Sequence, residues 1–112
     1  GNIKTIGKVS AIEVLTTSDE REKENIVPLE DPLEKILKLQ GTNFNWKKDE
    51  KKEKVSGLIA QKVETIIPEV VNNENDIKQI QYNGIIPYLV ECIKLQQEQI
   101  NELQQQIKKI SS

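Results

Sequence analysis

A heptad repeat near the C-terminus constrains the fold of this chain more than any other feature. Isoleucine recurs every seven residues from position 86 to position 107, and leucine, glutamine or isoleucine fills the intervening position. Such a pattern forms one apolar seam along a helix, which is buried only when another heptad helix packs against it. At roughly 1.5 Å per residue the helix would be about 40 Å long, too long to fold back on a small body. The seam residues are Ile86, Leu89, Ile93, Gln96, Ile100, Leu103, Ile107 and Ile110.

The heptad predicts a parallel homo-oligomer and by itself leaves the number of strands open. Isoleucine at position a with leucine at position d favours two strands, whereas Gln96 and Ile110 depart from that rule. The flanking positions hold glutamines, so interhelical salt bridges do not select the partner. Cys92 borders the seam and is predicted to be a small apolar filler.

The composition indicates one small domain with a restricted chemistry. Of its 112 residues 36% are hydrophobic and 30% charged, the net charge is −2, and Arg21 is the one arginine. A duplex-DNA binder normally shows a clustered basic face, so no nucleic-acid partner is expected. With no histidine and one cysteine, Ser-His and Cys-His catalysis and an intrachain disulfide are excluded, and no metal or other cofactor is expected. No apolar run reaches the roughly 18 to 20 residues that cross a membrane, so no membrane partner is expected either.

The middle of the chain predicts a small body that begins with a helix. Asp31 is placed to cap this helix, Pro32 suits its first position, Glu34 would complete a capping box, and Gly41 provides the stop. The side of this helix predicted to be buried carries Leu33, Ile36, Leu37 and Gln40.

Short strands and a second helix are predicted to follow. Residues 42–46 alternate as a strand with Phe44 and Trp46 on one face, and the lysine-rich residues 47–54 are predicted to be a solvated loop or hairpin tip. A second helix is expected over 58–67, then an asparagine-rich turn and a strand over 77–82. The fold class is therefore α+β, a small mixed body with two helices, followed by the long coiled-coil helix. The buried face of the second helix is predicted to carry Ile59, Val63, Ile66 and Ile67.

The N-terminal stretch is ambiguous because its apolar residues fall three apart, from Ile3 to Leu15. This spacing fits neither a helix face nor a flat strand. It is consistent with an irregular extended arm, or with the last rung of a longer fibrous stem.

Residues 16–26 are the one place where the sequence offers a pair of groups for catalysis. Ser18 is followed five residues later by Lys23. A serine–lysine dyad needs a neutral amine, because an ammonium group cannot accept the hydroxyl proton, and neighbouring glutamates oppose that state. Thr17 followed by Glu20 also matches a capping box, so spacing alone favours a charged first turn over catalysis.

The blocks of sequence around this pair resemble a known family. They are similar to the intramolecular chaperone auto-processing domain that ends phage tail spikes and fibres of the endosialidase type, with a related domain in the myelin regulatory factor. The resemblance runs from Ser18 to the C-terminus. It rests on Ser18–Ile26, Leu33–Leu39, Phe44–Trp46, Gly57–Glu64, Ile67–Val71 and Tyr82–Val90.

The resemblance implies a self-cleaving serine peptidase that acts once. Domains of this family form trimers, assist folding of the upstream fibre and then cut the chain before the signature serine. The resemblance implies Ser18 as nucleophile, Thr17–Ser18 as the scissile bond and Lys23 as base. Asp19, Arg21 and Asn25 match the motif as supports of the loop, and Glu22 stands where an apolar residue is expected.

The resemblance also divides the chain and names its partners. Residues 1–17 would end the upstream passenger, 18–83 would form the auto-processing chaperone, and 84–112 the helix of a parallel trimeric coiled coil. The partners implied are two further copies and the passenger of the same polypeptide. The released chaperone would remain in the host cytoplasm during virion assembly, with the passenger in the virion tail or fibre. A non-catalytic trimerisation module of the same fold and a coiled-coil adaptor with a coincidental Ser-Lys spacing are the alternatives.

Overall fold

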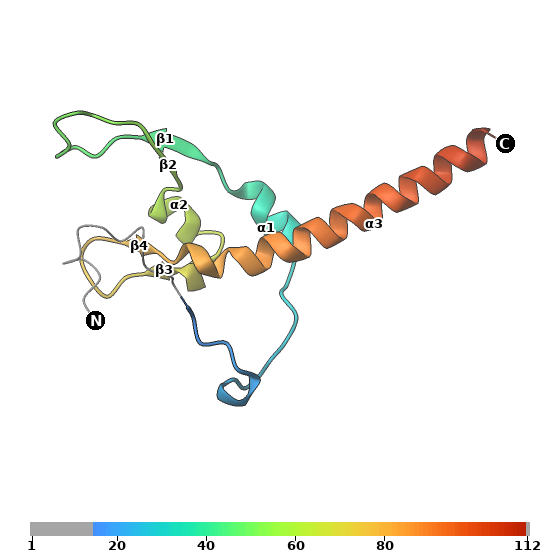
Figure 1. Ribbon diagram of the computed structural model, residues 1–112, viewed down its shortest axis with the longest axis horizontal. Coiled ribbons are helices and arrows are strands. Elements are labelled where there is room, and N and C mark those ends of the chain that lie inside the picture. The colour runs from blue at the N-terminus through green and yellow to red at the C-terminus, as the bar shows by residue number, and fades with distance from the viewer. Residues whose placement is uncertain (1–14, 112) are drawn as a thin grey trace.

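The structure, a computed structural model, describes residues 15–111 and consists of a small α+β body from which a long helix projects (Figure 1). The long helix is α3 (Ile86–Ser111), and the body contains helices α1 (Pro32–Lys38) and α2 (Ala60–Glu64). This architecture confirms the predicted α+β body followed by a long C-terminal helix. The N-terminal stretch from Ile3 to Leu15, for which an extended arm or a fibre rung was expected, lies outside the described residues except for Leu15, which is exposed.

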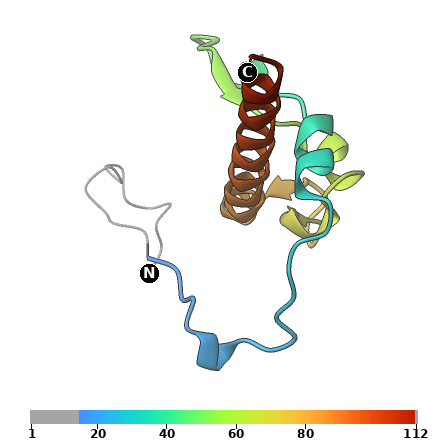
Figure 2. The ribbon, with the colours of Figure 1, turned by 90° about the vertical axis from the view of Figure 1, so that its right-hand side faces the viewer.

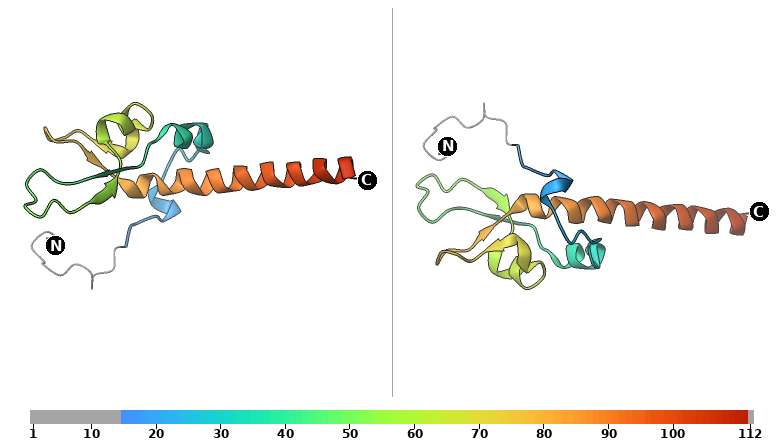
Figure 3. Two further views of the ribbon diagram at one scale, coloured as in Figure 1. Left: turned by 90° about the horizontal axis from the view of Figure 1, so that it is seen from above. Right: turned by 90° about the horizontal axis from the view of Figure 1, so that it is seen from below.

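Two short antiparallel hairpins complete the body. Strand β1 (Thr42–Phe44) pairs with β2 (Val55–Gly57), which confirms the lysine-rich segment between them as a hairpin tip. Strand β3 (Val71–Asn72) pairs with β4 (Gln79–Ile80). Figure 3 shows both hairpins gathered near the N-terminal end of α3, so the rest of that helix extends away from the body.

The core forms where α2, α3 and two 3-10 turns meet. These turns are η4 (Pro68–Val70), which follows α2, and η5 (Tyr82–Gly84), which leads into α3. Ile36 and Leu39, at the end of α1, pack against the cluster from outside. The fully buried members confirm part of the predicted face of α2, since Val63 and Ile67 are at most 1% exposed. The core cluster is Val63, Ile67, Val70, Ile85 and Tyr88.

Tyr88 connects three elements of the body. Its ring packs in the core, its hydroxyl donates to the Glu69 carboxylate, and the Lys35 ammonium lies 5.7 Å from the ring centroid. Burial and the Glu69 hydrogen bond raise the pKa of Tyr88 to about 12, so its hydroxyl stays protonated at neutral pH. This anchor fixes the first turns of α3 against α1 and η4.

Helix α3 carries two apolar faces, and the chain's own body covers only one of them. Tyr88 and Cys92 are buried on the chain's own body, and Leu95 is half-buried on the same side. The heptad seam lies beside this face, and its seven apolar residues are between 44% and 84% exposed. After Leu95 the helix continues for about 24 Å with no body beside it. The seam is therefore an apolar surface that this chain does not cover.

The start of α1 differs from the predicted capping box. Asp31 precedes the helix with a left-handed φ of 47°, and its side chain makes no capping hydrogen bond. An N-cap residue normally has extended geometry, which aims its side chain at the first free N–H groups. With a left-handed backbone, the Asp31 side chain is not directed at those N–H groups. Pro32, whose φ is already helical, begins the helix without a side-chain cap.

The end of α1 also differs, because the helix stops at Lys38 and not beside Gly41. Leu37, predicted on its buried side, is 71% exposed. A helix of two turns offers only a narrow stripe to a core, and Ile36 and Leu39 occupy it here.

The other predicted elements are present but shorter. Trp46 lies beyond β1, yet its ring meets Phe44 edge-to-face at 5.0 Å, as the shared face predicts. Helix α2 covers only the middle of 58–67, and Ile59 remains at its exposed edge. The strand expected over 77–82 is reduced to β4, because Tyr82 enters η5, where its hydroxyl oxygen accepts a hydrogen bond from Leu58 N. Its partner β3 was not predicted.

Any larger residue at Gly84 is expected to destabilise the fold, because η5 lies directly against the core. A Cβ atom at this position would lie 2.6 Å from Val70 Cγ1, whereas one at Gly41 would meet nothing within 4 Å. Gly84→Ala should therefore lower the free energy of unfolding by about 1–3 kcal/mol through overpacking, and Gly41→Ala should change it by less than about 0.5 kcal/mol. Urea denaturation at a fixed protein concentration measures both, and equal effects would contradict the close approach of η5 to Val70.

Candidate functional site

The candidate site lies on an arm, residues 15–28, that runs outside the body. Every residue of this arm is exposed, and its regular structure is a single 3-10 turn, η3 (Glu20–Glu22). Figure 2 shows the arm standing apart from α3 and entering the body at α1. The local geometry of the arm therefore comes from contacts between its own residues.

Asp19 and Arg21 hold the turn closed, and we call their contact the clamp. The Asp19 carboxylate accepts from Arg21 N at 2.9 Å, which caps η3, and from Arg21 Nη2 at 2.8 Å and Nε at 3.1 Å. Glu22 N donates to Asp19 O at 3.0 Å. One carboxylate thus caps the backbone and pairs with the guanidinium two residues later. The predicted capping box of Thr17 and Glu20 is wrong, because the cap is Asp19.

The clamp brings Ser18 and Lys23 together across the turn. Lys23 N donates to Glu20 O at 3.0 Å, and Lys23 Nζ donates to Ser18 Oγ at 2.7 Å. Asn25 follows with a left-handed φ of 54°, a conformation that asparagine tolerates better than most residues. The structure therefore joins the predicted nucleophile and base in one hydrogen bond, with the predicted supporting residues on either side.

Charge pairing stabilises the ionised form of the clamp. The hydrogen bonds with Arg21 lower the pKa of the Asp19 carboxyl, and the same contact raises the pKa of the Arg21 guanidinium. The Arg21 side chain is 88% exposed, so salt and water screen this pair. The clamp thus orders the turn without burying it.

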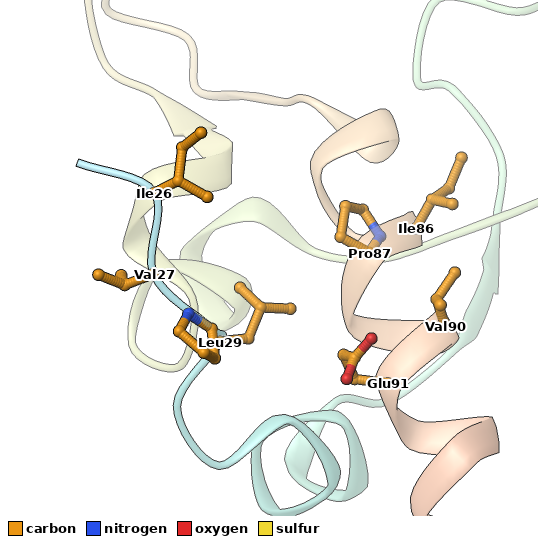
Figure 4. A pocket seen from close by; sticks show the side chains of 8 residues that line it. Ile26, Val27, Leu29, Ile86, Pro87, Val90 and Glu91 are labelled. Carbon is orange, nitrogen blue, oxygen red and sulfur yellow. The ribbon is translucent and has the colours of Figure 1, made fainter. Parts of the chain in front are cut away.

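A shallow apolar groove separates the arm from the body. One wall comes from the end of the arm and the other from the first turns of α3, which face each other across a space of about 650 Å³ (Figure 4). Ile26 and Val27 are 66% and 77% exposed, and Ile86 belongs to both the groove and the heptad seam. The groove was not predicted, although two apolar residues directly after a charged run gave a sign of it. It is lined by Ile26, Val27, Pro28, Leu29, Ile86, Pro87, Val90 and Glu91.

Apart from the serine–lysine pair, residues 15–111 hold one free cysteine and no candidate metal site. No group of three or more acidic, histidine or cysteine side chains in this range could hold a metal ion. The Cys92 thiol is buried, as the predicted apolar filler requires, and burial raises the pKa of the thiol. None of the helices in the same range is both long and apolar enough to pass through a membrane.

Comparison with known proteins assigns a family to the part of the chain that begins with the serine–lysine pair. Residues 18–72, which begin at Ser18, match the family model described as the chaperone of endosialidase, a peptidase family. The chain therefore contains a domain of the chaperone-of-endosialidase family, which begins at Ser18.

The similar curated proteins are phage tail fibres. The chain is 31% identical to the long tail fiber protein Gp37 of Salmonella phage S16 over 93% of its own length, which is 15% of that protein. It is 35% identical to the long tail fiber protein Gp37 of Escherichia phage AR1 over 66% of its length, or 8% of that protein. The chain thus spans less than a sixth of the length of either of these relatives.

Proposed function

We propose that this chain is an intramolecular chaperone that assembles three copies of a tail-fibre polypeptide and then releases itself by cutting between Thr17 and Ser18. Family membership supports the chaperone role and the tail-fibre relatives support the kind of passenger. The observation that carries the cleavage is the 2.7 Å contact between Lys23 Nζ and Ser18 Oγ. Residues 1–17 then end the passenger, 18–83 form the chaperone body and 84–112 the assembly helix.

The exposed heptad seam supports the assembly step. Seven apolar side chains along one helix are stable in water only when partner helices cover them. The proposed number of strands is three, which matches the resemblance to trimeric chaperone domains. A fibre of three chains must bring distant strands into register before any ladder forms, and loop-closure entropy makes such pairing slow. A terminal coiled coil would speed this pairing, because it holds the three chains together at high local concentration.

The cleavage chemistry begins with a proton transfer across the observed contact. In the structure Nζ is the donor, and once the amine is neutral the same separation lets it accept the Ser18 hydroxyl proton. Ser18 Oγ then forms a bond to the Thr17 carbonyl carbon. The bond between that carbon and Ser18 N breaks, and the nitrogen takes a proton as it leaves.

Two routes lead from the activated Ser18 hydroxyl to the same products. In one, the attack by Oγ leaves an ester between Thr17 and Ser18 Oγ, which water hydrolyses in a second step. In the other, Oγ takes a proton from a water molecule, whose oxygen bonds to the Thr17 carbonyl carbon while the bond to Ser18 N breaks and the nitrogen takes a proton. Both end with a carboxylate on Thr17 and a free amine on Ser18. The passenger then loses its template for refolding, so its later stability is kinetic.

Assembly is also expected to supply the water-excluded surroundings that cleavage requires and that the arm of a single chain lacks. An exposed lysine is well solvated as an ammonium group, and an exposed carbonyl gains no preorganised donors for its developing negative charge. Because the groove shares Ile86 with the seam, a partner helix on the seam lies next to the groove and the arm. We infer that partner chains cover the arm and remove water from the dyad, so cleavage follows trimer formation.

The clamp is expected to set the rate of cleavage by holding the dyad in contact. Asp19→Ala removes the cap and the guanidinium pairing together, and should slow cleavage by roughly tenfold or more through misplacement of Lys23. Glu20→Ala is the matched control, because it removes a carboxylate from the same turn that forms no part of the clamp. Equal rates for both variants, followed by intact mass, would show that the clamp does not position the dyad.

The pH dependence of the clamp can be measured separately. Since pairing with Arg21 lowers the pKa of Asp19, the clamp is complete above the ordinary carboxyl range and is lost as the pH falls through the lowered value. Hydrogen exchange of the Arg21 amide, which Asp19 caps, reports this loss without reference to cleavage.

Intact mass of the purified chain followed over time tests the proposal directly. Two fragments that meet between Thr17 and Ser18 are expected. A chain that assembles as a trimer but never cleaves would instead indicate the non-catalytic trimerisation module.

A further inference from the structure

Gln96 is the one polar residue in the heptad seam. It occupies a d position between Ile93 and Ile100, and it is exposed in the single chain. Its neighbour Gln97 donates to Asn101 along the helix surface at 3.0 Å, whereas the Gln96 side chain forms no hydrogen bond with the part of the chain that the structure describes. A leucine, as at Leu89, would bury more apolar surface here, so the carboxamide weakens the seam unless it serves another purpose.

Parallel helices give Gln96 a suitable partner in a single alignment. In a parallel coiled coil each d residue packs beside the d residues of the other chains. Gln96 therefore meets another Gln96 only when the helices are in register, and carboxamides can satisfy one another because each donates and accepts. A slip of one heptad places it against Leu89 or Leu103, and a slip of two against Ile110, where its hydrogen-bonding groups lack a partner.

Antiparallel helices give Gln96 no suitable partner at all. In that orientation a d residue of one helix faces an a residue of the other. Every a position of this seam is isoleucine, so each antiparallel alignment buries the carboxamide against an isoleucine. Without Gln96 the seam would be apolar throughout, and no layer would distinguish these arrangements. The a positions are Ile86, Ile93, Ile100 and Ile107.

We propose that Gln96 determines the specificity of assembly by allowing only the parallel, in-register alignment of α3. The inference rests on the proposed assembly through the seam and adds the residue that sets its alignment. Its consequence is that all copies of the body lie at the same end and the same height. An upstream fibre with strands from several chains requires this, since a shift in register misplaces every pair.

Distances between spin labels at the end of α3 test this role. The label is placed on Ser111→Cys in a Cys92→Ala background, and sedimentation establishes the assembled state. With Gln96 present, one short distance is expected. With Gln96→Leu, misaligned populations should rise by about tenfold or more, since the unpaired carboxamide no longer disfavours them. Antiparallel pairs would separate the labels by about 39 Å, and a slip of one heptad would shift them by about 10 Å.

Two control variants separate the carboxamide from general effects on the helix. Gln96→Asn keeps the amide in the seam and should keep the single short distance. Gln105→Leu adds the same apolar side chain on the face opposite the seam and should leave the alignment unchanged. Mixed distances in the unmodified chain, or a single short distance in assembled Gln96→Leu, would overturn this inference while leaving the assembly itself intact. A monomeric unmodified chain would overturn the proposed assembly, and this inference with it.

Discussion

Replacing Ser18 with alanine is expected to keep the 112-residue chain intact under conditions in which the unmodified chain separates into pieces of 17 and 95 residues. The variant removes the oxygen that attacks the Thr17 carbonyl carbon, and loss of a nucleophile typically reduces such a rate by on the order of 10³ or more. Ser56→Ala is the matched control, because it removes a serine hydroxyl from the β1–β2 hairpin, where it donates to Asn43. Mass spectrometry of both variants over the same time course gives the comparison.

Lys23→Arg distinguishes a base from a simple hydrogen-bond donor at the same position. Arginine retains a donor and a positive charge, but its guanidinium keeps its proton at any usable pH and cannot accept one from Ser18. Cleavage should therefore stop in this variant, whereas Lys38→Arg on the surface of α1 should cleave normally. In the unmodified chain the rate should rise with pH, because the neutral amine is the active form. Equal rates for Lys23→Arg and the unmodified chain would exclude Lys23 as the base, and a fragment that begins elsewhere than at Ser18 would exclude the proposed bond.

The serine–lysine contact illustrates how far sequence patterns reach. The spacing of Ser18 and Lys23 together with the family motif predicted which residues would meet, and the structure brings them within hydrogen-bond distance. The pattern did not predict how they meet. The turn depends on one Asp19 carboxylate that serves a backbone N–H and a guanidinium at once, and on a left-handed Asn25. Both are details of local geometry that several side chains compete to determine, so the sequence predicted Thr17 as the cap in place of Asp19.

Helix α3 illustrates the opposite case, in which periodicity predicted a long element well and its surroundings poorly. The heptad identified the helix and its seam, but the second apolar face was not predicted. That face is defined by contacts with α1 and the core, which are distant in sequence. Spacing along one helix reveals which residues share a face, but it does not reveal whether that face packs on the same chain or on another. The structure separates the two, because it buries Tyr88 and Cys92 and leaves the seam exposed.

Placing aspartate at both Ile100 and Leu103 is expected to convert the assembled protein into monomers. Both residues lie beyond Leu95, where no body flanks the helix, and are about half exposed, so the change should leave the fold of the body intact. In an assembled coiled coil the same change would bury unpaired charges in adjacent layers, at a cost of several kcal/mol for each chain. Asn101→Asp with Gln105→Asp adds equal charge to the same stretch outside the seam, and should remain assembled.

With Ser18→Ala also present, so that the chain stays intact, sedimentation should give about 12.8 kDa for the seam variant and three times that mass for the control pair. Helix content should fall in the seam variant as well, because the part of α3 beyond Leu95 is only about four turns long and is marginal in water without a partner. Cleavage between Thr17 and Ser18 should disappear together with the trimer, because the arm then keeps its exposed dyad in water. A seam variant that stays assembled would contradict assembly through the heptad seam. A monomer that cleaves at the normal rate would show that the clamp and the dyad are sufficient for cleavage within one chain.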